Sequence, residues 1–332
     1  MTTENRVKWG VMGCANIAVQ HVLPAMMLAE NATLLAAASR TLDKAQGVAD
    51  QFGAPRAYGS YEALLADPDV EAVYIPLPNN MHKPWSIAAV EAGKHVLCEK
   101  PMALDAAEAR DMQAAAKAND RLILEAFMYR HSPVVQRTIE LVREGVIGEL
   151  REMYASFSFV ITPDAANVRL WGGKGGGAIY DVGCYCLNVL RMVAGREPVS
   201  VSATFGWSDE FDVDMSGEGV LDFDENLRGL FSARFDSSGG SYFRAKGTKG
   251  SLELCVGFLG REPLPQIVVS VGAVKKTIAV PGPSPYTLEI EDMGRAVRGE
   301  ADSIYAWEPL DANMKVIDAS LESWRTGKRV SI

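Results

Sequence analysis

Residues 7–18 read Val7-Lys8-Trp9-Gly10-Val11-Met12-Gly13-Cys14-Ala15-Asn16-Ile17-Ala18, and this stretch decides the fold class. It predicts an apolar strand, a tight turn at Gly13 and a helix that begins near Ile17. The turn is a version of the dinucleotide-binding fingerprint in which alanines replace the second and third glycines. The N–H groups and positive dipole end of the helix would face a pyrophosphate. An isolated match has a competing explanation, since Gly13 would also serve a plain turn.

Short apolar runs alternate with amphipathic segments from Val7 to Glu125, which is typical of parallel strands joined by crossover helices. The expected strands are Val7–Met12, Thr33–Ser39, Ala72–Ile75, His95–Cys98 and Leu122–Glu125, with a short one near Ala57; helices begin near Ile17, Leu42, Lys83 and Asp105. Strands that are apolar throughout are covered on both faces. We therefore predict an α/β doubly wound Rossmann sheet, with ligands at the carboxyl ends of its strands.

The pattern changes after Glu125 to mixed or alternating runs that predict one large, mainly antiparallel sheet. The runs are Glu152–Ile161, Val199–Gly206, Gly219–Phe223, Arg228–Phe235, Ser251–Val256, Ile267–Val271 and Lys276–Val280, with helices at Pro133–Glu144, Cys186–Val193, Tyr286–Arg298 and Pro309–Thr326. The sequence thus predicts two domains. Residues 1–127 would form the dinucleotide-binding domain, and residues 128–332 an α+β domain for substrate binding and oligomerisation.

The second expected strand ends at Ser39-Arg40, a little over the roughly 20 residues beyond the glycine turn where an NAD-preferring fold places a carboxylate. No acidic residue occupies that strand end. Ser39 and Arg40, with Lys44 one turn on, would suit a ribose 2′-phosphate, because arginine offers paired donors to phosphate oxygens. The sequence favours NADP over NAD. The alternative places Arg40 and Lys44 on a solvated helix face.

The loop after the Ala72–Ile75 strand would lie at the same binding edge. Its prolines stiffen it, and Leu77 would lie against the adenine or the nicotinamide. We place Pro76, Leu77 and Asn79 among the cofactor-binding residues. His82 is ambiguous between a residue at a helix N-terminus and a contact with cofactor phosphate or substrate.

Two motifs would offer a lysine and a tyrosine to one cleft: Cys98-Glu99-Lys100-Pro101 at a strand end, and Asp181-Val182-Gly183-Cys184-Tyr185 at a turn that opens a helix. Hydride transfer to a ketone leaves an alkoxide, so a proton donor must stand within hydrogen-bond reach of the oxygen. A neighbouring ammonium would lower the pKa of a tyrosine and make it a better acid–base group at neutral pH. We assign Lys100 and Tyr185 jointly as the pair and leave open which delivers the proton.

Residues beside the tyrosine motif have a functional and a structural interpretation. Asp181, four residues before Tyr185, would hold a substrate hydroxyl or orient Lys100, or would merely cap the helix. Arg169 and Trp171 would reach into the same cleft as substrate contacts, or lie at the surface. The glycines at 175–177 precede the motif and would let the chain approach cofactor or substrate closely.

Together these segments resemble the glucose-fructose oxidoreductase / inositol dehydrogenase / MocA family. The resemblance is carried by the turn Gly13-Cys14-Ala15-Asn16-Ile17-Ala18, by Glu99-Lys100-Pro101, by Glu125-Ala126-Phe127-Met128-Tyr129-Arg130, and by the run from Gly175 to Tyr185. It implies a Rossmann domain, a C-terminal domain with an open antiparallel sheet, a nicotinamide dinucleotide, and action on sugars, ketosugars, cyclitols or related alcohols. It also implies a cis Lys100-Pro101 bond, which places the lysine beside the nicotinamide. Glu99 would contact the cofactor. Glu125 would lie near the nicotinamide ribose or beside Lys100, or form an ion pair at the domain junction.

With a tyrosine at position 185, the chain resembles the NADP-using sugar branch of the family, in which this position is a tyrosine. That branch includes D-xylose dehydrogenases, dihydrodiol dehydrogenases and ketosugar reductases. The implied function is NADP-dependent hydride transfer between the nicotinamide and a hydroxyl or carbonyl carbon of a sugar or ketosugar. One alternative is a trans-dihydrodiol dehydrogenase, which a hydrophobic substrate pocket would favour. The other is a non-catalytic dinucleotide-sensing regulator, which would have no need for Lys100 and Tyr185.

Composition limits the partners and the compartment. The 332 residues include 33 Lys and Arg against 42 Asp and Glu, and the formal charge of -9 would repel nucleic acid. The five cysteines are scattered, as expected of buried thiols in a reducing compartment. We expect a cytoplasmic protein, because no basic leader with a cleavage site and no apolar run of about 20 residues is found.

The remaining expectations concern metal, assembly and substrate choice. The four histidines are dispersed and no zinc-like spacing occurs, so we expect no metal. An apolar outer face on the second sheet, as alternation within Gly219–Phe235 allows, would be covered by a second copy in a homodimer or homotetramer. The loops after Ile161 and around Phe258–Pro265 would set the identity of the substrate.

Overall fold

The computed structural model describes residues 5–164, 166–254, 265–305 and 308–332. They form two units, the first from Met1–Met128 and Ser284–Ala312, the second from Tyr129–Pro283 and Asn313–Ile332. We expected residues 128–332 to stay together as the second domain, and this expectation was wrong for the segment that returns to the first unit. That segment carries helix α8 (Pro285–Val297), which packs against helix α1 (Leu23–Leu28) and strand β2 (Ala32–Ala38).

The first unit contains a parallel six-stranded sheet in the order β3-β2-β1-β4-β5-β6. Besides β2, its strands are β1 (Val7–Met12), β3 (Arg56–Tyr58), β4 (Ala72–Ile75), β5 (His95–Cys98) and β6 (Ile123–Glu125). All four residues of β4 are buried, as expected for a central strand covered on both faces. The doubly wound Rossmann sheet predicted from the sequence is confirmed.

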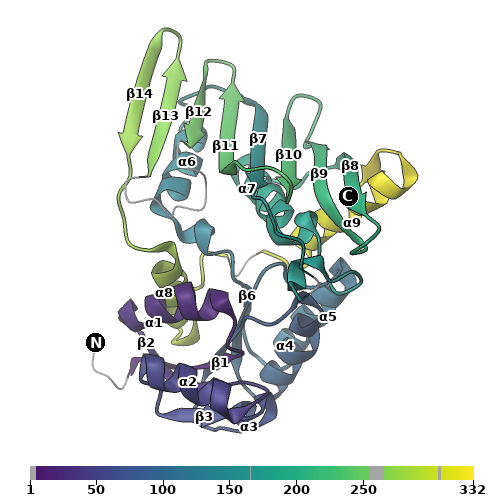
Figure 1. Ribbon diagram of the computed structural model, residues 1–332. Helices are drawn as coiled ribbons and strands as arrows, with labels where there is room; N and C mark the ends of the chain where they lie inside the picture. Colours follow the sequence, from purple (N-terminus) through teal and green to yellow (C-terminus); the bar gives the residue numbers. More distant parts are fainter. Residues whose placement is uncertain (1–4, 165, 255–264, 306–307) are drawn as a thin grey trace. The chain divides into compact units, whose positions relative to one another are not determined.

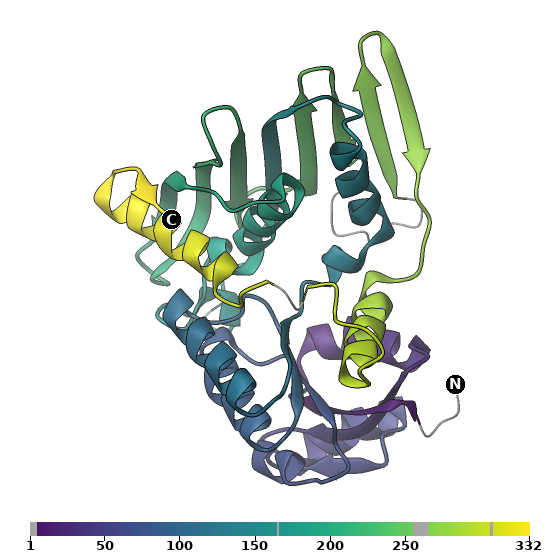
Figure 2. The same ribbon diagram turned by 180° about the vertical axis from the view of Figure 1, so that it is seen from behind.

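Helices cover both faces of this sheet. They are α1 and α8, the π-helical turn η2 (Ala18–Val22), α2 (Leu42–Phe52), α3 (Tyr61–Leu65), the short η3 (Asn79–Met81), α4 (His82–Glu91) and α5 (Ala106–Ala118). Figures 1 and 2 show α4 and α5 on one side of the strands and α1 with α8 on the other. Asp105 caps α5, since its carboxylate accepts the N–H of Glu108 at 2.8 Å. The short helix α3 was not expected from the sequence.

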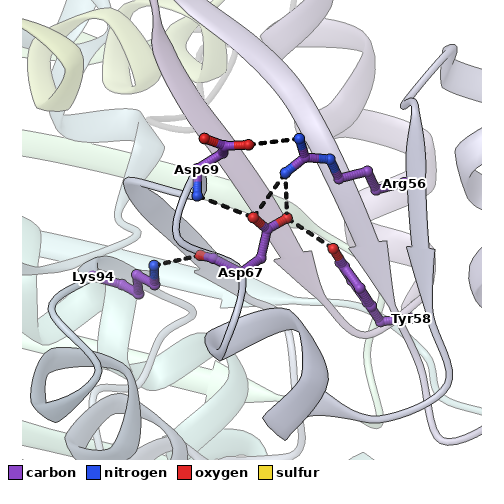
Figure 3. A network of polar contacts seen from close by, with 5 residues as sticks. All are labelled: Arg56, Tyr58, Asp67, Asp69 and Lys94. Carbon is purple, nitrogen blue, oxygen red and sulfur yellow. Dashed lines mark hydrogen bonds and ion pairs between the residues drawn. The ribbon is translucent and has the colours of Figure 1, made fainter.

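A network of polar contacts fixes the edge strand β3 to the turn before β4 (Figure 3). The Asp67 carboxylate accepts bonds from Arg56 Nη1 at 2.7 Å and from the Tyr58 hydroxyl at 2.8 Å. Two main-chain groups also take part in the network. The N–H of Asp69 donates to the Asp67 carboxylate at 3.0 Å, and the carbonyl of Asp67 accepts a bond from Lys94 Nζ at 2.6 Å. The Asp67 side chain is only 3% exposed, so these bonds replace the water it has lost.

The second unit contains a nine-stranded sheet in the order β14-β13-β12-β11-β7-β10-β9-β8-β15. The strands are β7 (Leu150–Ser158), β8 (Ser200–Ser208), β9 (Val213–Asp222), β10 (Arg228–Arg234), β11 (Gly240–Gly247), β12 (Gly250–Leu254), β13 (Gln266–Val271), β14 (Val274–Ala279) and β15 (Val330–Ser331). The pair β7 and β10 is parallel, and the other neighbouring strands of the described sheet are antiparallel. The large, mainly antiparallel sheet is confirmed.

Two features of this sheet differ from the expectation. β11 was missed, because Gly240 and the polar residues Tyr242, Arg244 and Lys246 hide the alternation with buried Phe243 and Ala245. β9 begins at Val213, six residues before the expected Gly219. The end of the expected strand Ser251–Val256 lies outside the described residues, and so does the expected substrate loop Phe258–Pro265 except for Pro265 itself.

Helices α6 (Pro133–Arg143), α7 (Cys184–Ala194) and α9 (Ala312–Thr326) pack on one face of the sheet (Figure 2). The short elements η4 (Met128–His131), η5 (Val168–Leu170) and η6 (Ile179–Gly183) lie in the connections. The covered face carries the buried side chains, including Phe231, Phe243 and Ala155. Because side chains alternate along a strand, the residues between them face the other side.

The other face of the sheet is not the apolar surface that we expected. Across it, Lys246 pairs with Glu152 and Arg234 with Glu218. The rings of Tyr154 and Tyr242 lie between these pairs, with centroids 5.9 Å apart. The face is therefore charged, with an aromatic centre.

No helix among the residues that the structure describes is both long enough and apolar enough to span a bilayer.

The Asp67 network leads to a stability prediction. Asp67→Asn should lower the free energy of unfolding by about 2 kcal/mol at neutral pH, because the substitution removes a buried anion that accepts charge-assisted hydrogen bonds. Burial alone would raise the pKa of Asp67, but the bonds from Arg56, Asp69 N–H and Tyr58 hold it below its ordinary 3.8. A carboxyl with a lowered pKa stabilises the fold above its unfolded-state pKa, and this stabilisation is lost as pH falls through the folded-state value.

Urea unfolding at several pH values measures the difference between the two proteins. It should be largest near pH 7 and shrink below about pH 4. Asp69→Asn is the matched control, since the Asp69 side chain is 49% exposed and bonds the same Arg56. Equal losses in both variants would contradict the account.

Candidate active site

The turn after β1 requires glycine. Gly13 has φ +119° and donates its N–H to the carbonyl of Ala38 at 2.8 Å. A Cβ at this position would lie 2.9 Å from Leu77 Cδ2 and 3.8 Å from the hydroxyl of Tyr61. The turn therefore brings the loop after β4 and the start of α3 to the end of β1, at the edge where ligands bind in such sheets. Tyr61 lies at this edge and was not among the residues expected there.

The helix after this turn is left open to an anion. The helix begins at Asn16, and the N–H of Val19 donates to the carbonyl of Ala15 at 3.1 Å, so the N–H groups before Val19 have no partner one turn back within the helix. Its first turns include the π-helical η2, a feature that is frequent at functional sites. Uncapped N–H groups at a helix N-terminus are suited to phosphate.

The end of β2 adds two cations and two polar groups to this edge. Ser39 is buried and bonds the thiol of Cys14, whose Sγ also lies 3.5 Å from the carbonyl oxygen of Lys44. Burial raises the pKa of the Cys14 thiol, although Ser39 and the charge of Lys44 oppose the rise. Arg40 and Lys44 are exposed and form no ion pair with another described residue. The positive charge of Arg40 reaches Tyr61, where it partly offsets the rise in pKa that burial causes.

The loops after β4 and β5 are joined by His82. This residue is fully buried, with Nδ1 2.9 Å from the carbonyl of Pro101 and Nε2 2.8 Å from the carbonyl of Leu77. Burial lowers the pKa of the imidazole, and the bonds to the carbonyls oppose this. Both ring nitrogens face protein oxygens, so the cofactor contact we assigned to His82 is wrong. The residue holds the loop containing Pro76, Leu77 and Asn79 against the lysine loop.

Lys100 follows β5 at this same edge, and its bond to Pro101 is cis, as the family resemblance implied. The Glu99 carboxylate accepts the hydroxyl of Tyr74 at 2.6 Å and the N–H of Lys100 at 3.2 Å. Glu125 accepts the N–H of Met102 at 2.8 Å. The two carboxylates thus hold the main chain on either side of the cis bond, which fixes where the Lys100 side chain starts.

The second unit carries the tyrosine on a helix that begins earlier than expected. Five π-helical residues, η6, precede α7, so the helix starts before Cys186. Tyr185 is 7% exposed and packs between Tyr129 and Phe157, at ring-centroid distances of 5.6 and 5.8 Å. The phenol therefore sits in an aromatic wall, with little freedom to change rotamer.

Asp181 pairs with Arg169 near this tyrosine. Arg169 Nε lies 2.6 Å from Asp181 Oδ2, and the charge of Asp181, against the opposing effect of burial, raises the pKa of Arg169. Asp181 lies inside η6, so the capping role considered for it is wrong. The guanidinium also lies 5.8 Å from the centre of the Phe159 ring. Trp171 packs under Lys174, whose Nζ is 4.9 Å from the ring centre.

The glycines before η6 lie close to other parts of the protein chain. A Cβ at Gly176 would lie 2.7 Å from the carbonyl oxygen of Trp171, and one at Gly177 only 2.0 Å from Asp214 Oδ1. Asp214 is buried at the start of β9 and accepts the N–H of Ile179 at 2.7 Å. Asp214 was not predicted, because the expected strand began only at Gly219. The alternating run around Val213 and Met215 could have indicated a strand, and the acidic residue between them could have indicated a functional group.

Among the described residues, no group of three or more His, Cys, Asp or Glu side chains is arranged to hold a metal ion. The described residues therefore offer a glycine turn, two unpaired cations and a lysine on one sheet edge of the first unit. The second unit offers a tyrosine beside an arginine–aspartate pair.

A parallel sheet with this turn, joined to a domain with a large antiparallel sheet, defines the class of two-domain dinucleotide-binding oxidoreductases. Residues 7–127 match the family model described as "Oxidoreductase family, NAD-binding Rossmann fold", and residues 135–253 match the "GFO/IDH/MocA C-terminal domain". The chain belongs to the glucose-fructose oxidoreductase / inositol dehydrogenase / MocA family.

Individual relatives resemble the chain over most of its length. It is 36% identical over 326 residues to the D-xylose 1-dehydrogenase (NADP(+)) 2 of Haloferax volcanii, which covers 98% of this chain and 99% of the relative. It is 35% identical over 253 residues to the trans-1,2-dihydrobenzene-1,2-diol dehydrogenase of Mus musculus, covering 75% of this chain and 74% of the relative.

A solved structure of a related enzyme has a similar fold. It is that of a 3-ketoreductase from Actinomadura kijaniata, crystallised as a tyrosine-to-phenylalanine variant with TDP-benzene and NADP. It matches with a TM-score of 0.91 at 28% identity, over 96% of this chain and 98% of that one.

Proposed function

We propose that this protein is an NADP-dependent oxidoreductase that transfers a hydride between the nicotinamide and a hydroxyl or carbonyl carbon of a sugar or ketosugar. The observation that carries the proposal is the position of Lys100, which follows β5 at the sheet edge where the Gly13 turn follows β1. The dinucleotide would bind the first unit and the substrate the second. The NADP named for the xylose dehydrogenase and the ketoreductase supports this choice of cofactor.

The residues of the first unit fit the dinucleotide. The Gly13 turn and the uncapped helix would take the pyrophosphate, with Cys14, Ala15, Asn16 and Ile17 supplying the main chain. Ser39, Arg40 and Lys44 would hold the 2′-phosphate, since both cations lack a carboxylate partner among the described residues. Pro76, Leu77 and Asn79 would line the other side of the site.

The acid–base step would use Lys100 and Tyr185 together. The nicotinamide, when bound, gives or takes the hydride. During reduction the substrate oxygen gains a proton from Tyr185 Oη or Lys100 Nζ, and solvent returns a proton to the donor. The ammonium of Lys100 would stabilise the phenolate of Tyr185 in the meantime. Asp181 and Arg169 would orient a neighbouring hydroxyl of the substrate, with Trp171 beside them.

A second candidate function is trans-dihydrodiol dehydrogenase activity. The half-buried ring of Phe157 beside Tyr185 favours it, because an apolar wall suits a ring derived from an aromatic compound. The relative from Mus musculus bears that name. A non-catalytic dinucleotide sensor is the third candidate, and it would bind NADPH without consuming it.

We also propose a homodimer or homotetramer formed through the charged face of the nine-stranded sheet. Its rows of Glu152 and Lys246, and of Glu218 and Arg234, would meet opposite charges on a second copy turned by a two-fold axis. The tyrosines between them would form the centre. Sedimentation equilibrium should give more than one copy per particle, and Tyr154→Lys, which places a lysine opposite Arg244 at the centre, should give monomer. A monomeric wild-type protein would contradict the proposal.

We propose a reducing, cytoplasmic compartment. Among the described residues, Cys14, Cys98, Cys184 and Cys186 form no disulfide bond, which supports this proposal.

The catalytic assignment predicts that Lys100→Ala and Tyr185→Phe each lower kcat at least about 100-fold, which is the usual contribution of a positioned proton donor. Tyr185→Phe keeps the ring that packs against Tyr129 and Phe157, so the fold should stay intact. The assay follows loss of nicotinamide absorbance with NADPH and a panel of ketosugars and, in the reverse direction, with NADP, sugars and dihydrodiols. Lys117→Ala removes an exposed cation on α5, away from the proposed site, and serves as the control.

Each outcome of this assay separates the candidates. Turnover of sugars or ketosugars supports the leading proposal, and turnover of dihydrodiols alone supports the second candidate. NADPH binding without any turnover would point to the sensor. A Lys100→Ala protein with unchanged kcat would show that the acid–base assignment is wrong.

The cofactor assignment predicts that Arg40→Ala weakens NADPH binding about 10- to 100-fold, the effect of losing about 1.5–3 kcal/mol of charge-assisted hydrogen bonds. NADH binding should change little, because NADH has no 2′-phosphate. Fluorescence titration of both dinucleotides measures the difference. Lys117→Ala, an exposed cation on α5, is the control. Equal weakening of NADPH and NADH would contradict the 2′-phosphate contact.

A further inference from the structure

The helix that carries Tyr185 begins without a capping side chain of its own. Ala178 and Gly183, the residues before η6 and α7, offer no side-chain bond. The first N–H groups of a helix have no partner within it and need one from elsewhere. The hydrogen-bond acceptors of these N–H groups therefore determine how firmly the start of the helix is held.

Asp214 supplies that partner from a different part of the chain. Its Oδ2 accepts the N–H of Ile179 at 2.7 Å, and the N–H of Ala178 also bonds the carboxylate. Asp214 is 1% exposed and forms no ion pair with another described residue. The carboxylate is thus committed to the main chain at the start of η6, 35 positions away in sequence.

The loop before the helix is shaped to receive this carboxylate. Gly177 has φ +112°, and a Cβ there would lie 2.0 Å from Asp214 Oδ1. Gly172 approaches the same segment, since its Cβ would lie 2.7 Å from the Cβ of Asp212. Asp212 itself has φ +53°, a conformation that residues other than glycine rarely adopt. Two glycines and one strained aspartate thus meet where the loop crosses the start of β9.

The surroundings of the carboxylate are apolar. Ala178 and Val182 of the helix, and Val213 beside Asp214, belong to one buried cluster with Leu170 and Phe235. Burial raises the pKa of Asp214 to about 7, although the N–H groups of Ile179, Asp214 and Ala178 oppose the rise. No charged side chain contributes to the shift. Burying a carboxylate among apolar side chains costs free energy unless the carboxylate is hydrogen-bonded, and the N–H groups at the helix start supply these bonds here.

We infer that Asp214 is a positioning residue for the proposed acid–base tyrosine: its carboxylate anchors the turn at 177–179 and so sets the placement of Tyr185 and Asp181 on the helix that follows. Tyr185 lies two residues after Gly183, the end of η6, so a shift in the first turn moves the phenol directly. Because Asp214 takes the capping role, Asp181 is available to pair with Arg169. The inference rests on the proposed function, since it assigns Asp214 to the same reaction.

The experiment compares the wild-type protein with Asp214→Asn and Gly177→Ala. Asp214→Asn keeps the shape of the side chain but replaces one acceptor oxygen with a donor amide, and Gly177→Ala pushes a methyl group into the carboxylate. Both should lower kcat about tenfold or more with the ketosugar that the wild type reduces. The KM for NADPH should stay within about twofold, because the dinucleotide would bind the first unit. A loss caused only by poor folding would lower the active fraction and leave kcat per folded site unchanged.

Gly173→Ala is the matched control for the glycine. Gly173 also has a positive φ, +67°, and lies in the same loop, but a Cβ there would meet nothing within 4 Å. It should therefore show the strain of a left-handed alanine without the contact to Asp214. Activity that falls equally in Gly173→Ala and Gly177→Ala would overturn the inference.

Amide hydrogen exchange supplies a readout that does not depend on activity. In Asp214→Asn the amides of residues 178–186 should exchange at least about tenfold faster, while those of β11 and of the first unit keep wild-type rates. Unchanged exchange at 178–186 would overturn the inference, as would faster exchange throughout the chain. If Asp214→Asn does not fold, the same measurement on Gly177→Ala decides. If the wild type shows no turnover, the proposed function fails, whereas exchange still tests the anchor.

Discussion

The first unit depends on one constraint, which is that the carboxyl ends of parallel strands meet at a single edge of the sheet. β1 ends before Gly13, β2 before Ser39 and β5 before Glu99, so residues far apart in sequence reach the same edge. His82 then ties the loop after β4 to the loop after β5 through two carbonyl groups. Strand order thus brings the glycine turn, the two cations and Lys100 to one edge, and the loops that follow the strands then fix each of them in place.

The first unit was easier to predict than the second, because its strands are buried on both faces and give unbroken apolar runs. The second sheet is covered on one face, so its strands bury only alternate residues, and β11 was missed because it buries only Phe243 and Ala245. No local pattern in the sequence indicates that residues 284–312 return to the first unit. The return results from tertiary contacts such as Asn31 Nδ2 to the carbonyl of Glu291, at 2.8 Å.

In the candidate site, too, residues in local sequence patterns were predicted, and residues whose role depends on distant contacts were not. Gly13, Ser39 and Arg40 were predicted from their register along one strand–turn–helix unit, and the structure places them at the expected strand ends. The role of His82 was not predictable, because its two partners come from loops that only the fold brings together. Tyr61 was missed for a similar reason, since it belongs to the short helix α3, which the sequence did not indicate.

The two aspartates of the second unit show what sequence spacing can and cannot give. Spacing alone made Asp181 a candidate cap for the tyrosine helix, because a carboxylate near a helix start satisfies N–H groups. The structure gives that task to Asp214, which is buried, and leaves Asp181 beside Arg169, whose side chain is 44% exposed. An ion pair with one exposed partner contributes little to stability and exchanges readily with water. Asp181 and Arg169 can therefore give up part of their mutual contact to a substrate hydroxyl, which a carboxylate committed to capping could not do.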